Sequence, residues 1–423
     1  MGTGLLMLPF STVSGHISFM DALFTATSAV CVTGLIVQDT AAFFAPFGQV
    51  TILLLFQVGG LGILTFSTVI LLAAGKRISI TDRIIIEQGF HHSPSHDFKS
   101  LIKNIFVYAL LFEFLGAAFL MLRWNQEFPF CRGFFISLFH SVSAFCNAGF
   151  SLFSSSLQAY RGDIWVNAVV IFLIVSGGLG FLVHLELRQF FVNLLRKHRS
   201  QLSLHAKLVL SMTLLLILAC WAIFLGLEWN GALSGMPIPE KLTASLFQVV
   251  TPRTAGFNTM SLGALSTAAV SLLFVLMFIG ASPGSTGGGV KTTTIGVIFA
   301  FLRSKLAARE SVNLFYRTLP PAQINTAFSA VTLGICVIGL AAFLLALEQP
   351  GAGLQQILFE VFSAFGTVGL SLGLTGELRS AGKLIIILTM YIGRIGPLVL
   401  LLAFSRRRSR GRFEYGEEKV MIG

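Results

Sequence analysis

Long apolar stretches dominate the pattern of hydrophobic and polar positions along this 423-residue chain. A helix needs about 20 apolar residues to cross roughly 30 Å of hydrocarbon, and six stretches reach that length. A seventh, near residues 264–302, is also long but is interrupted. The pattern therefore predicts an all-α integral membrane protein. The six continuous stretches lie near residues 48–74, 101–122, 164–187, 206–228, 325–347 and 383–404.

The interruption in the seventh stretch covers residues 280–290, which read Gly-Ala-Ser-Pro-Gly-Ser-Thr-Gly-Gly-Gly-Val. Proline removes a helix hydrogen bond and glycine adds backbone freedom, so this segment cannot continue the helix. Non-helical backbone persists at membrane depth only where it is buried in protein or lines water. We therefore expect this break to be functional.

A short motif recurs four times, each time as a half-span apolar segment followed by a turn that contains glycine. The four segments are Ser28–Gly34, Ser143–Gly149, Thr251–Gly256 and Ser363–Gly369, and their glycines are 115, 107 and 113 residues apart. Each repeat reads as span, short helix, turn and span. The sequence therefore predicts four pseudo-repeated units around a central ion pore. Each unit consists of a helix, a re-entrant pore helix and a second helix.

The segment before each glycine is roughly 10–13 residues long, too short to cross the bilayer, so the chain must return as extended backbone. Unpaired carbonyls there are costly unless a dehydrated cation replaces water, and glycine permits the positive φ that such a turn needs. The alternative for any single glycine is close helix packing. Four equivalent positions favour an ion filter, with a cation bound by backbone carbonyls of Val32, Thr33, Gly34, Asn147, Ala148, Gly149, Thr254, Ala255, Gly256, Thr367, Val368 and Gly369.

The repeat sets the predicted domain boundaries. Counting back from Gly34 by the spacing of the other units places the start of the first helix before Met1, so we expect most of that helix, at least ten mostly apolar residues, to lie upstream. The expected parts are pore unit one (1–74), pore unit two (98–187), pore unit three with its broken second helix (204–303), pore unit four (323–405) and a basic tail (406–423).

Charge is scarce and unevenly placed. Charged residues make up 11% of the chain, against about 25% in a soluble domain, which excludes a soluble protein. The net charge is +11, and 20 of the 29 basic residues fall on one set of span ends, including the C-terminal tail. These ends are cytoplasmic by the positive-inside rule, so the excess indicates a cytoplasmic rim and anionic lipid rather than nucleic acid.

No catalytic constellation is apparent. The five cysteines are dispersed without a paired spacing, which predicts neither a disulfide framework nor a zinc site. No Ser/His pair or paired Asp sits at matched depth in the spans. We therefore expect neither an enzyme nor a resident cofactor.

The four glycine loops, the phrase Thr251-Pro-Arg-Thr-Ala-Gly-Phe-Asn258 and the broken span Gly284-Ser-Thr-Gly-Gly-Gly-Val-Lys-Thr292 together resemble the Trk/Ktr/HKT superfamily of potassium transporters, most closely the KtrB-type membrane subunit. The resemblance implies a channel-like K⁺ uptake subunit of the plasma membrane, a homodimer, and a cytosolic nucleotide-binding ring of KtrA or TrkA type as partner. Gly34, where plant Na⁺ transporters of the superfamily carry serine, favours K⁺. Na⁺ permeation or dependence stays open.

Three basic residues fall inside apolar regions, where charges are usually functional. We expect Arg394, midway along the last span, to hydrogen-bond a pore-closing loop and to oppose cations; the alternative is that it only joins helices. We expect Arg253 to point behind the filter, with Glu360 as its partner or as a cation attractor, and Lys291 to snorkel to the cytoplasmic interface. The predicted gate loop comprises Gly284, Ser285, Thr286, Gly287, Gly288 and Gly289.

A second function class is an alternating-access secondary symporter that couples K⁺ to Na⁺ or H⁺. Such carriers bind substrate at broken helices and are built from inverted halves. Four parallel repeats with four re-entrant loops fit that class poorly, so the sequence favours a filter and a gate.

Overall fold

A computed structural model describes residues 1–62, 98–198 and 200–396. The end of the predicted unit one, the basic residues between 76 and 97, the end of unit four and the basic tail 406–423 lie outside these residues. The described chain is almost entirely helical, and its strands β1 (Asn313–Leu314) and β2 (Arg317–Thr318) form one short antiparallel hairpin.

The helices follow the predicted repeat. Unit one contains α1 (Gly2–Leu6), the 3-10 turn η1 (Pro9–Ser11), α2 (Phe19–Val30) and α3 (Pro46–Leu61). Unit two contains α6 (Phe98–Trp124), α7 (Phe130–Cys146), η2 (Gln158–Tyr160), α8 (Ile164–Leu179) and α9 (Phe181–Leu195). Unit three contains α10 (Leu204–Glu228), α11 (Ile238–Val250), η3 (Leu262–Ala264), α12 (Thr267–Phe278) and α13 (Thr292–Leu306). Unit four contains α14 (Pro321–Glu348), α15 (Leu354–Gly366), α16 (Leu374–Glu377) and α17 (Ser380–Ile395).

Several of these helices begin where a side chain caps the first free backbone N–H groups. Ser18 accepts from the Asp21 amide at the start of α2, and Asp163 accepts from the Val166 amide at the start of α8, both at 3.1 Å. Polar residues at the ends of apolar runs therefore define where the helices start.

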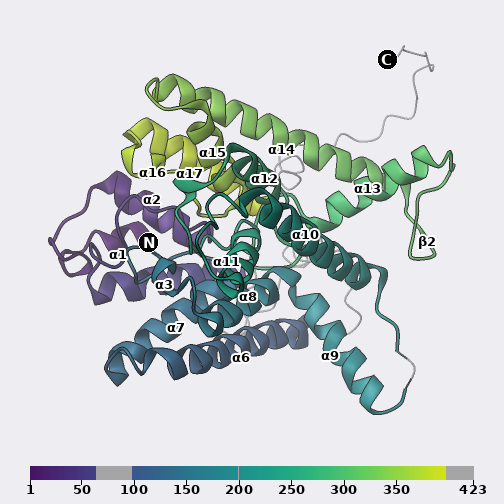
Figure 1. The fold of residues 1–423 in the computed structure, drawn as a ribbon, viewed down its shortest axis with the longest axis horizontal. Coiled ribbons are helices and arrows are strands. Elements are labelled where there is room, and N and C mark those ends of the chain that lie inside the picture. The colour runs from purple at the N-terminus through teal and green to yellow at the C-terminus, as the bar shows by residue number, and fades with distance from the viewer. Residues whose placement is uncertain (63–97, 199, 397–423) are drawn as a thin grey trace.

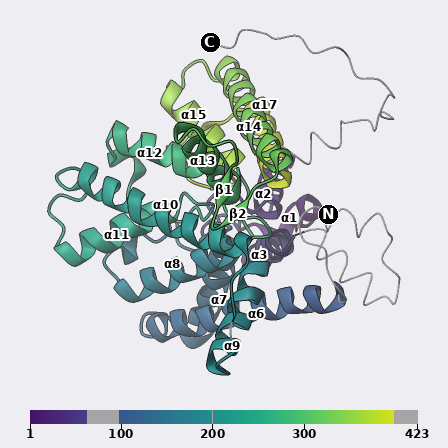
Figure 2. The same ribbon diagram turned by 90° about the vertical axis from the view of Figure 1, so that its right-hand side faces the viewer.

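The four units follow one another around a centre, as Figures 1 and 2 show. The second helix of each unit packs on the pore helix of the next: α3 on α7, α8 on α11, α12 on α15, and α17 on α2. The last pair joins unit four to unit one and closes the circle. The predicted fold class is therefore confirmed.

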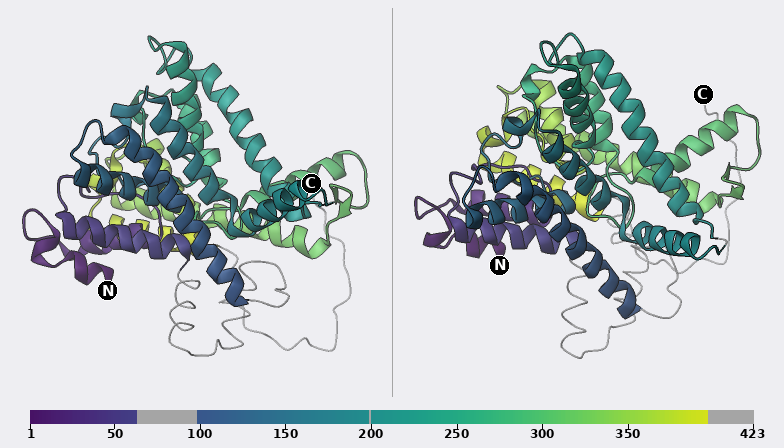
Figure 3. Two further views of the ribbon diagram at one scale, coloured as in Figure 1. Left: turned by 90° about the horizontal axis from the view of Figure 1, so that it is seen from below. Right: turned by 60° about the horizontal axis from the view of Figure 1, so that its bottom comes forward.

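Three helices of the described chain are long and apolar enough to cross a membrane: Lys103–Trp124, Leu204–Glu228 and Pro321–Glu348. They are the first helices of units two, three and four. A bent pair, α8 and α9, supplies a fourth candidate span. The helices α9 and α13 and the β1–β2 hairpin lie at one end of the molecule, away from α1 and α2 (Figures 1 and 3).

The second helix of unit two is shorter than predicted because it breaks at glycine. The apolar stretch 164–187 is not one span: α8 ends at Leu179, and α9 leaves at 102°. Gly62, Gly180 and Gly396 follow α3, α8 and α17 with φ of 86°, 93° and 90°, a region that side-chain-bearing residues rarely adopt. The hydrophobic pattern continues through Gly180, so it does not reveal the bend there.

Candidate ion pathway

The pore helices α2, α7, α11 and α15 end at the four predicted filter segments, and the backbone has the same shape in each. Gly34, Gly149, Gly256 and Gly369 all have positive φ, between 71° and 92°. The residue two places earlier also has positive φ: Val32, Asn147, Thr254 and Thr367. Non-glycine residues seldom adopt this conformation, so its fourfold recurrence indicates one repeated functional turn.

Hydrogen bonds to the pore helices hold these turns. The amides of Thr33, Ala148 and Val368 donate to the serine carbonyl five residues earlier at 2.7–2.8 Å. The third turn is one residue shorter, and there Ala255 donates to the Thr251 carbonyl at 2.9 Å. The deletion in the third motif therefore changes the register of one bond but preserves the turn.

The four turns form a closed ring. A Cβ atom on Gly149 would lie 2.8 Å from the carbonyl oxygen of Ala255 in the next unit. Equivalent close approaches join Gly34 to the Ala148 carbonyl, Gly256 to that of Val368, and Gly369 to that of Thr33. Each glycine thus packs against the carbonyl that precedes the neighbouring glycine, and a side chain would push the turns apart.

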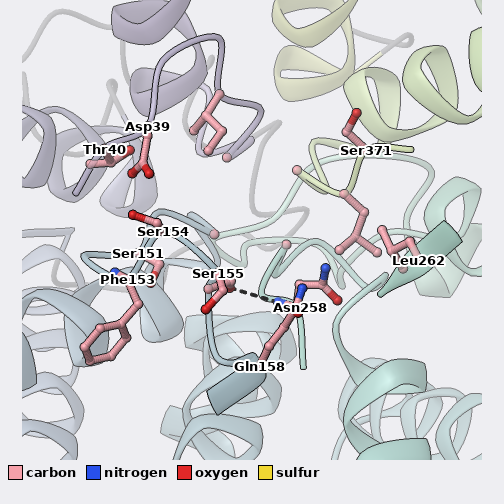
Figure 4. Close-up of a pocket in the computed structure, with 17 residues that line it drawn as sticks. Asp39, Thr40, Ser151, Phe153, Ser154, Ser155, Gln158, Asn258, Leu262 and Ser371 are labelled. Carbon is pink, nitrogen blue, oxygen red and sulfur yellow. Dashed lines mark hydrogen bonds between the residues drawn. The ribbon is translucent and has the colours of Figure 1, made fainter. Parts of the chain in front are cut away.

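A cavity of about 190 Å³ opens on the glycine side of this ring. All four filter glycines line it, together with serines and threonine from the loops that follow the filter (Figure 4). Among the described residues that line it there is one carboxylate, that of Asp39, and no Lys, Arg or His. We call this cavity the vestibule.

The broken segment of unit three lies against the opposite end of the ring. Gly288 donates its amide to the Thr367 hydroxyl at 3.0 Å, and the Thr286 hydroxyl lies 3.2 Å from the side-chain amide of Asn147. A Cβ atom on Gly287 would collide with the hydroxyl of Thr254. The predicted gate loop therefore contacts three of the four filter segments.

The loop is also bonded to the second helices around it. The Thr286 amide donates to the Gly177 carbonyl at 3.2 Å, and the Phe181 amide donates to the Gly284 carbonyl at 3.0 Å. The Gly289 amide reaches the Gly393 carbonyl at 3.3 Å. Because glycine leaves its backbone groups accessible, the loop satisfies its polar atoms in a buried position.

Arg394 joins the gate loop to unit one. Its guanidinium donates to the Thr286 carbonyl in the loop and to the Gly59 carbonyl at the end of α3. The expected contact between Arg394 and the loop is therefore present, and the arginine bridges units three, four and one.

Comparison with known proteins bears on this arrangement of filter, loop and arginine. The family described as TrkH, cation transport protein, matches residues 2–414. The chain belongs to the TrkH family. It is therefore a multi-pass membrane transport protein and not an enzyme.

Curated relatives of this TrkH-family chain include the Ktr system potassium uptake protein B of Bacillus subtilis, 40% identical over 426 residues, covering 100% of this chain and 94% of the relative. The potassium/sodium uptake protein NtpJ of Enterococcus hirae is 39% identical, with the same coverage. The crystal structure of the potassium transporter TrkH from Vibrio parahaemolyticus superposes with a TM-score of 0.70, covers 92% of this chain and 79% of its own, and shares 20% identity. The last comparison concerns the fold alone.

The other two intramembrane cations differ in part from expectation. Lys291 does not reach an interface: its ammonium donates to the Gly287 carbonyl at 2.8 Å, inside the gate loop. A carbonyl of the glycine-rich loop, which no side chain covers, is within reach of the Lys291 stem and accepts a hydrogen bond from its ammonium. Arg253 points behind the filter as expected, toward the Thr213 hydroxyl on α10 at 3.4 Å.

Glu360 is not the partner of Arg253. The carboxylate of Glu360, on α15, accepts from the hydroxyls of Ser371, at 2.8 Å, and Thr375. Both donors lie in the segment that follows the fourth filter turn. Glu360 therefore braces that segment instead of pairing with Arg253, and its role as a cation attractor stays a prediction.

Two features of the site were missed by sequence reasoning. Gly59, Gly177 and Gly393 press α3, α8 and α17 onto the last carbonyls of the preceding pore helices; the recurring Gly-x-x-Gly at each helix end is the signal that would have found them. Glu113, in the span α6, accepts from Gln57 at 3.0 Å through both carboxylate oxygens. A lone carboxylate in an apolar stretch is the signal for that pair.

Proposed function

We propose that this chain takes up K⁺ across the plasma membrane through the four-loop filter. The observation that carries the proposal is the closed ring, in which every filter glycine packs against a carbonyl of the next unit. Rings of backbone carbonyls replace the hydration shell of an ion. The names of the curated relatives, potassium uptake proteins and a potassium/sodium uptake protein, support the choice of ion.

The filter proposal is tested with Gly34→Ser. The added side chain would meet the Ala148 carbonyl and the Gly149 Cα, so it should widen or distort the ring. Gly373→Ser is the matched control, because Gly373 also has positive φ but has nothing within 4 Å of the added Cβ. In proteoliposomes, tracer Rb⁺ uptake competed by K⁺ and by Na⁺ should lose K⁺ preference in Gly34→Ser alone. Equal selectivity in both variants would reject the filter.

The gate forms the second part of the proposal. The loop 284–289 closes the inner end of the filter, and Arg394 holds it there while its charge opposes cations. Support comes from the contacts of the loop with Asn147, Thr254 and Thr367. Deleting residues 284–289 or replacing Arg394 by Gln should raise flux by about tenfold or more, since one buried charged hydrogen-bonding group contributes about 1.5–3 kcal/mol.

Arg379→Gln is the control for the arginine variant, because Arg379 starts the same helix α17 but is exposed. Initial rates of Rb⁺ uptake under a K⁺ gradient measure how far the gate limits flux. If Arg394→Gln and the deletion conduct like wild type, Arg394 only joins helices and the gate is wrong.

The proposal extends to assembly and orientation. The chain forms a homodimer, its C-terminus is cytoplasmic, and a nucleotide-binding ring of KtrA or TrkA type docks on the basic cytoplasmic side. The basic side and the Ktr names of relatives support this. Light scattering of the purified protein measures the subunit number, and labelling of a cysteine added to the tail measures its side.

Whether K⁺ transport requires a second ion distinguishes this proposal from a K⁺/Na⁺ or K⁺/H⁺ symporter. A filter with a gate conducts down a K⁺ gradient alone, whereas a symporter needs the second ion. Rb⁺ uptake in sodium-free medium, with and without a proton ionophore, decides between them. Uptake that stops when Na⁺ and the proton gradient are removed would favour the symporter; stimulation by Na⁺ above a basal flux would add Na⁺ dependence to the filter.

A further inference from the structure

In this strongly basic chain, the part of the vestibule lining that the structure describes carries a single negative charge. Asp39 lies in the loop after the first filter turn and contributes the one carboxylate of the vestibule lining. The net charge of the whole chain is +11. A concave surface of one charge sign concentrates counterions at its mouth, so Asp39 favours cations at the entrance to the filter.

The local backbone fixes the direction of this carboxylate. Oδ1 of Asp39 accepts from the Ala41 amide at 2.8 Å and from the Ala42 amide at 3.4 Å. Within the described residues, the second oxygen, Oδ2, has no hydrogen bond. Figure 4 shows the carboxylate directed into the cavity, toward Ser154. One oxygen thus orients the group and the other is left for a ligand.

A second polar group beside Asp39 lacks a partner. Thr40 is 2% exposed, and its hydroxyl makes no hydrogen bond in the described part of the chain although it lines the same cavity. A buried hydroxyl without a partner is costly unless a ligand or water satisfies it. The hydroxyl lies next to the Asp39 carboxylate in Figure 4.

We propose that Asp39 and Thr40 form an outer binding site for a partly hydrated monovalent cation, from which ions enter the filter. Carboxylate and hydroxyl oxygens are hard ligands suited to alkali cations, and the exposed Ser154 faces the same space from unit two. The site is separate from the carbonyl ring. This inference rests on the proposed conduction through the filter and names the group that loads it.

Asp39→Asn is the main test because it removes the charge while its amide oxygen can still accept from the Ala41 amide. Glu377→Gln is the matched control. Glu377 is exposed in α16, after the fourth filter turn, which is the position in unit four that corresponds to the loop of Asp39 in unit one. Glu377 is not among the residues that line the vestibule. Rb⁺ uptake into proteoliposomes is measured against Rb⁺ concentration, at low ionic strength and with added N-methylglucamine chloride.

At low ionic strength Asp39→Asn should raise the half-saturating Rb⁺ concentration by about threefold to tenfold with the maximal rate within about twofold, while Glu377→Gln matches wild type. Added salt should reduce the difference in half-saturating Rb⁺ concentration between Asp39→Asn and wild type, because salt screens the attraction between the Asp39 carboxylate and the cation. Thr40→Val, which keeps the shape but loses the hydroxyl, should raise the half-saturating concentration equally at both ionic strengths. Repeating the series with Na⁺ as competitor shows which alkali ion the site prefers.

An unchanged half-saturating concentration in both Asp39→Asn and Thr40→Val would overturn the site, and so would an equal shift in Glu377→Gln. Asp39→Glu should restore wild-type kinetics, which separates a lost charge from a damaged loop. Failure of the filter proposal has a different signature: Gly34→Ser and Gly373→Ser would then show equal K⁺ selectivity.

Discussion

In units one, two and four the second helix also contacts the pore helix of its own unit, and from this contact we predict the effect of a substitution at Gly393. A Cβ atom added there would lie 2.7 Å from the carbonyl carbon of Phe365 and closer still to its oxygen. Ordinary contacts begin at 3.4 Å, so α17 and α15 must separate by at least about 0.7 Å. Phe365 is two residues before Thr367, the filter residue that contacts the gate loop.

Two effects oppose each other in Gly393→Ala. Alanine in a helix gains roughly 0.5–1 kcal/mol over glycine, whereas overpacking costs about 1–3 kcal/mol. The clash is with backbone, which cannot rotate away, so we expect a net loss of about 1–2 kcal/mol. Gly339→Ala is the control, since Gly339 lies in the helix α14 with nothing within 4 Å, and it should be neutral or stabilising.

Thermal unfolding of both variants in detergent, followed by tryptophan fluorescence, measures the stability difference. Rb⁺ uptake competed by Na⁺ measures the effect on the filter, where Gly393→Ala should reduce K⁺ preference as well as rate. The reasoning is refuted if Gly393→Ala melts and conducts like Gly339→Ala, because the helix pair would then tolerate the added methyl group without moving.

Three further predictions concern charged groups. Lys291→Met removes the bond to the Gly287 carbonyl and should loosen the gate loop, raising basal Rb⁺ flux; flux equal to wild type would contradict this role. Glu360→Ala should lower the melting temperature by a few degrees, since it leaves two hydroxyl donors unpaired, and Glu360→Gln should recover part of the loss. Burial would raise the pKa of Asp21, but hydrogen bonds from Lys383 and Ser18 outweigh it and hold that pKa below its ordinary value of 3.8. Stability from the Asp21–Lys383 pair is therefore complete above pH 3.8 and is lost as pH falls through the lower folded pKa, so the difference in melting temperature between wild type and Asp21→Asn should shrink below pH 3.8; a constant difference would contradict it.

Much of the fold could be predicted from local sequence. The four motifs around Gly34, Gly149, Gly256 and Gly369 identified the units, because a half-length apolar segment followed by glycine has few other uses in a membrane. The same reasoning located the break at 280–290. It did not locate the bend at Gly180, since the apolar pattern runs through it and the hydrophobic effect is insensitive to direction.

The partners of the buried charges could not be predicted. Glu360 bonds Ser371 and Thr375 rather than Arg253, and Lys291 bonds the loop rather than extending to an interface. These partners lie in the same unit as the charged residue, in the non-helical filter and gate segments, and the apolar pattern does not specify the conformation of those segments. For Arg394 the expected contact was correct in the loop, but the Gly59 carbonyl of unit one was unforeseen.

The sequence by itself determined that this is a membrane protein of four repeated units with a glycine turn in each and a broken span in the third. It could do so because apolar length, glycine spacing and charge placement are local properties. Tertiary structure alone decided that the turns close into a ring, that the broken segment lies against one end of it, and that Asp39 and Thr40 border the vestibule at the other. These are distances between segments that lie far apart along the chain, and they are set by how the helices pack.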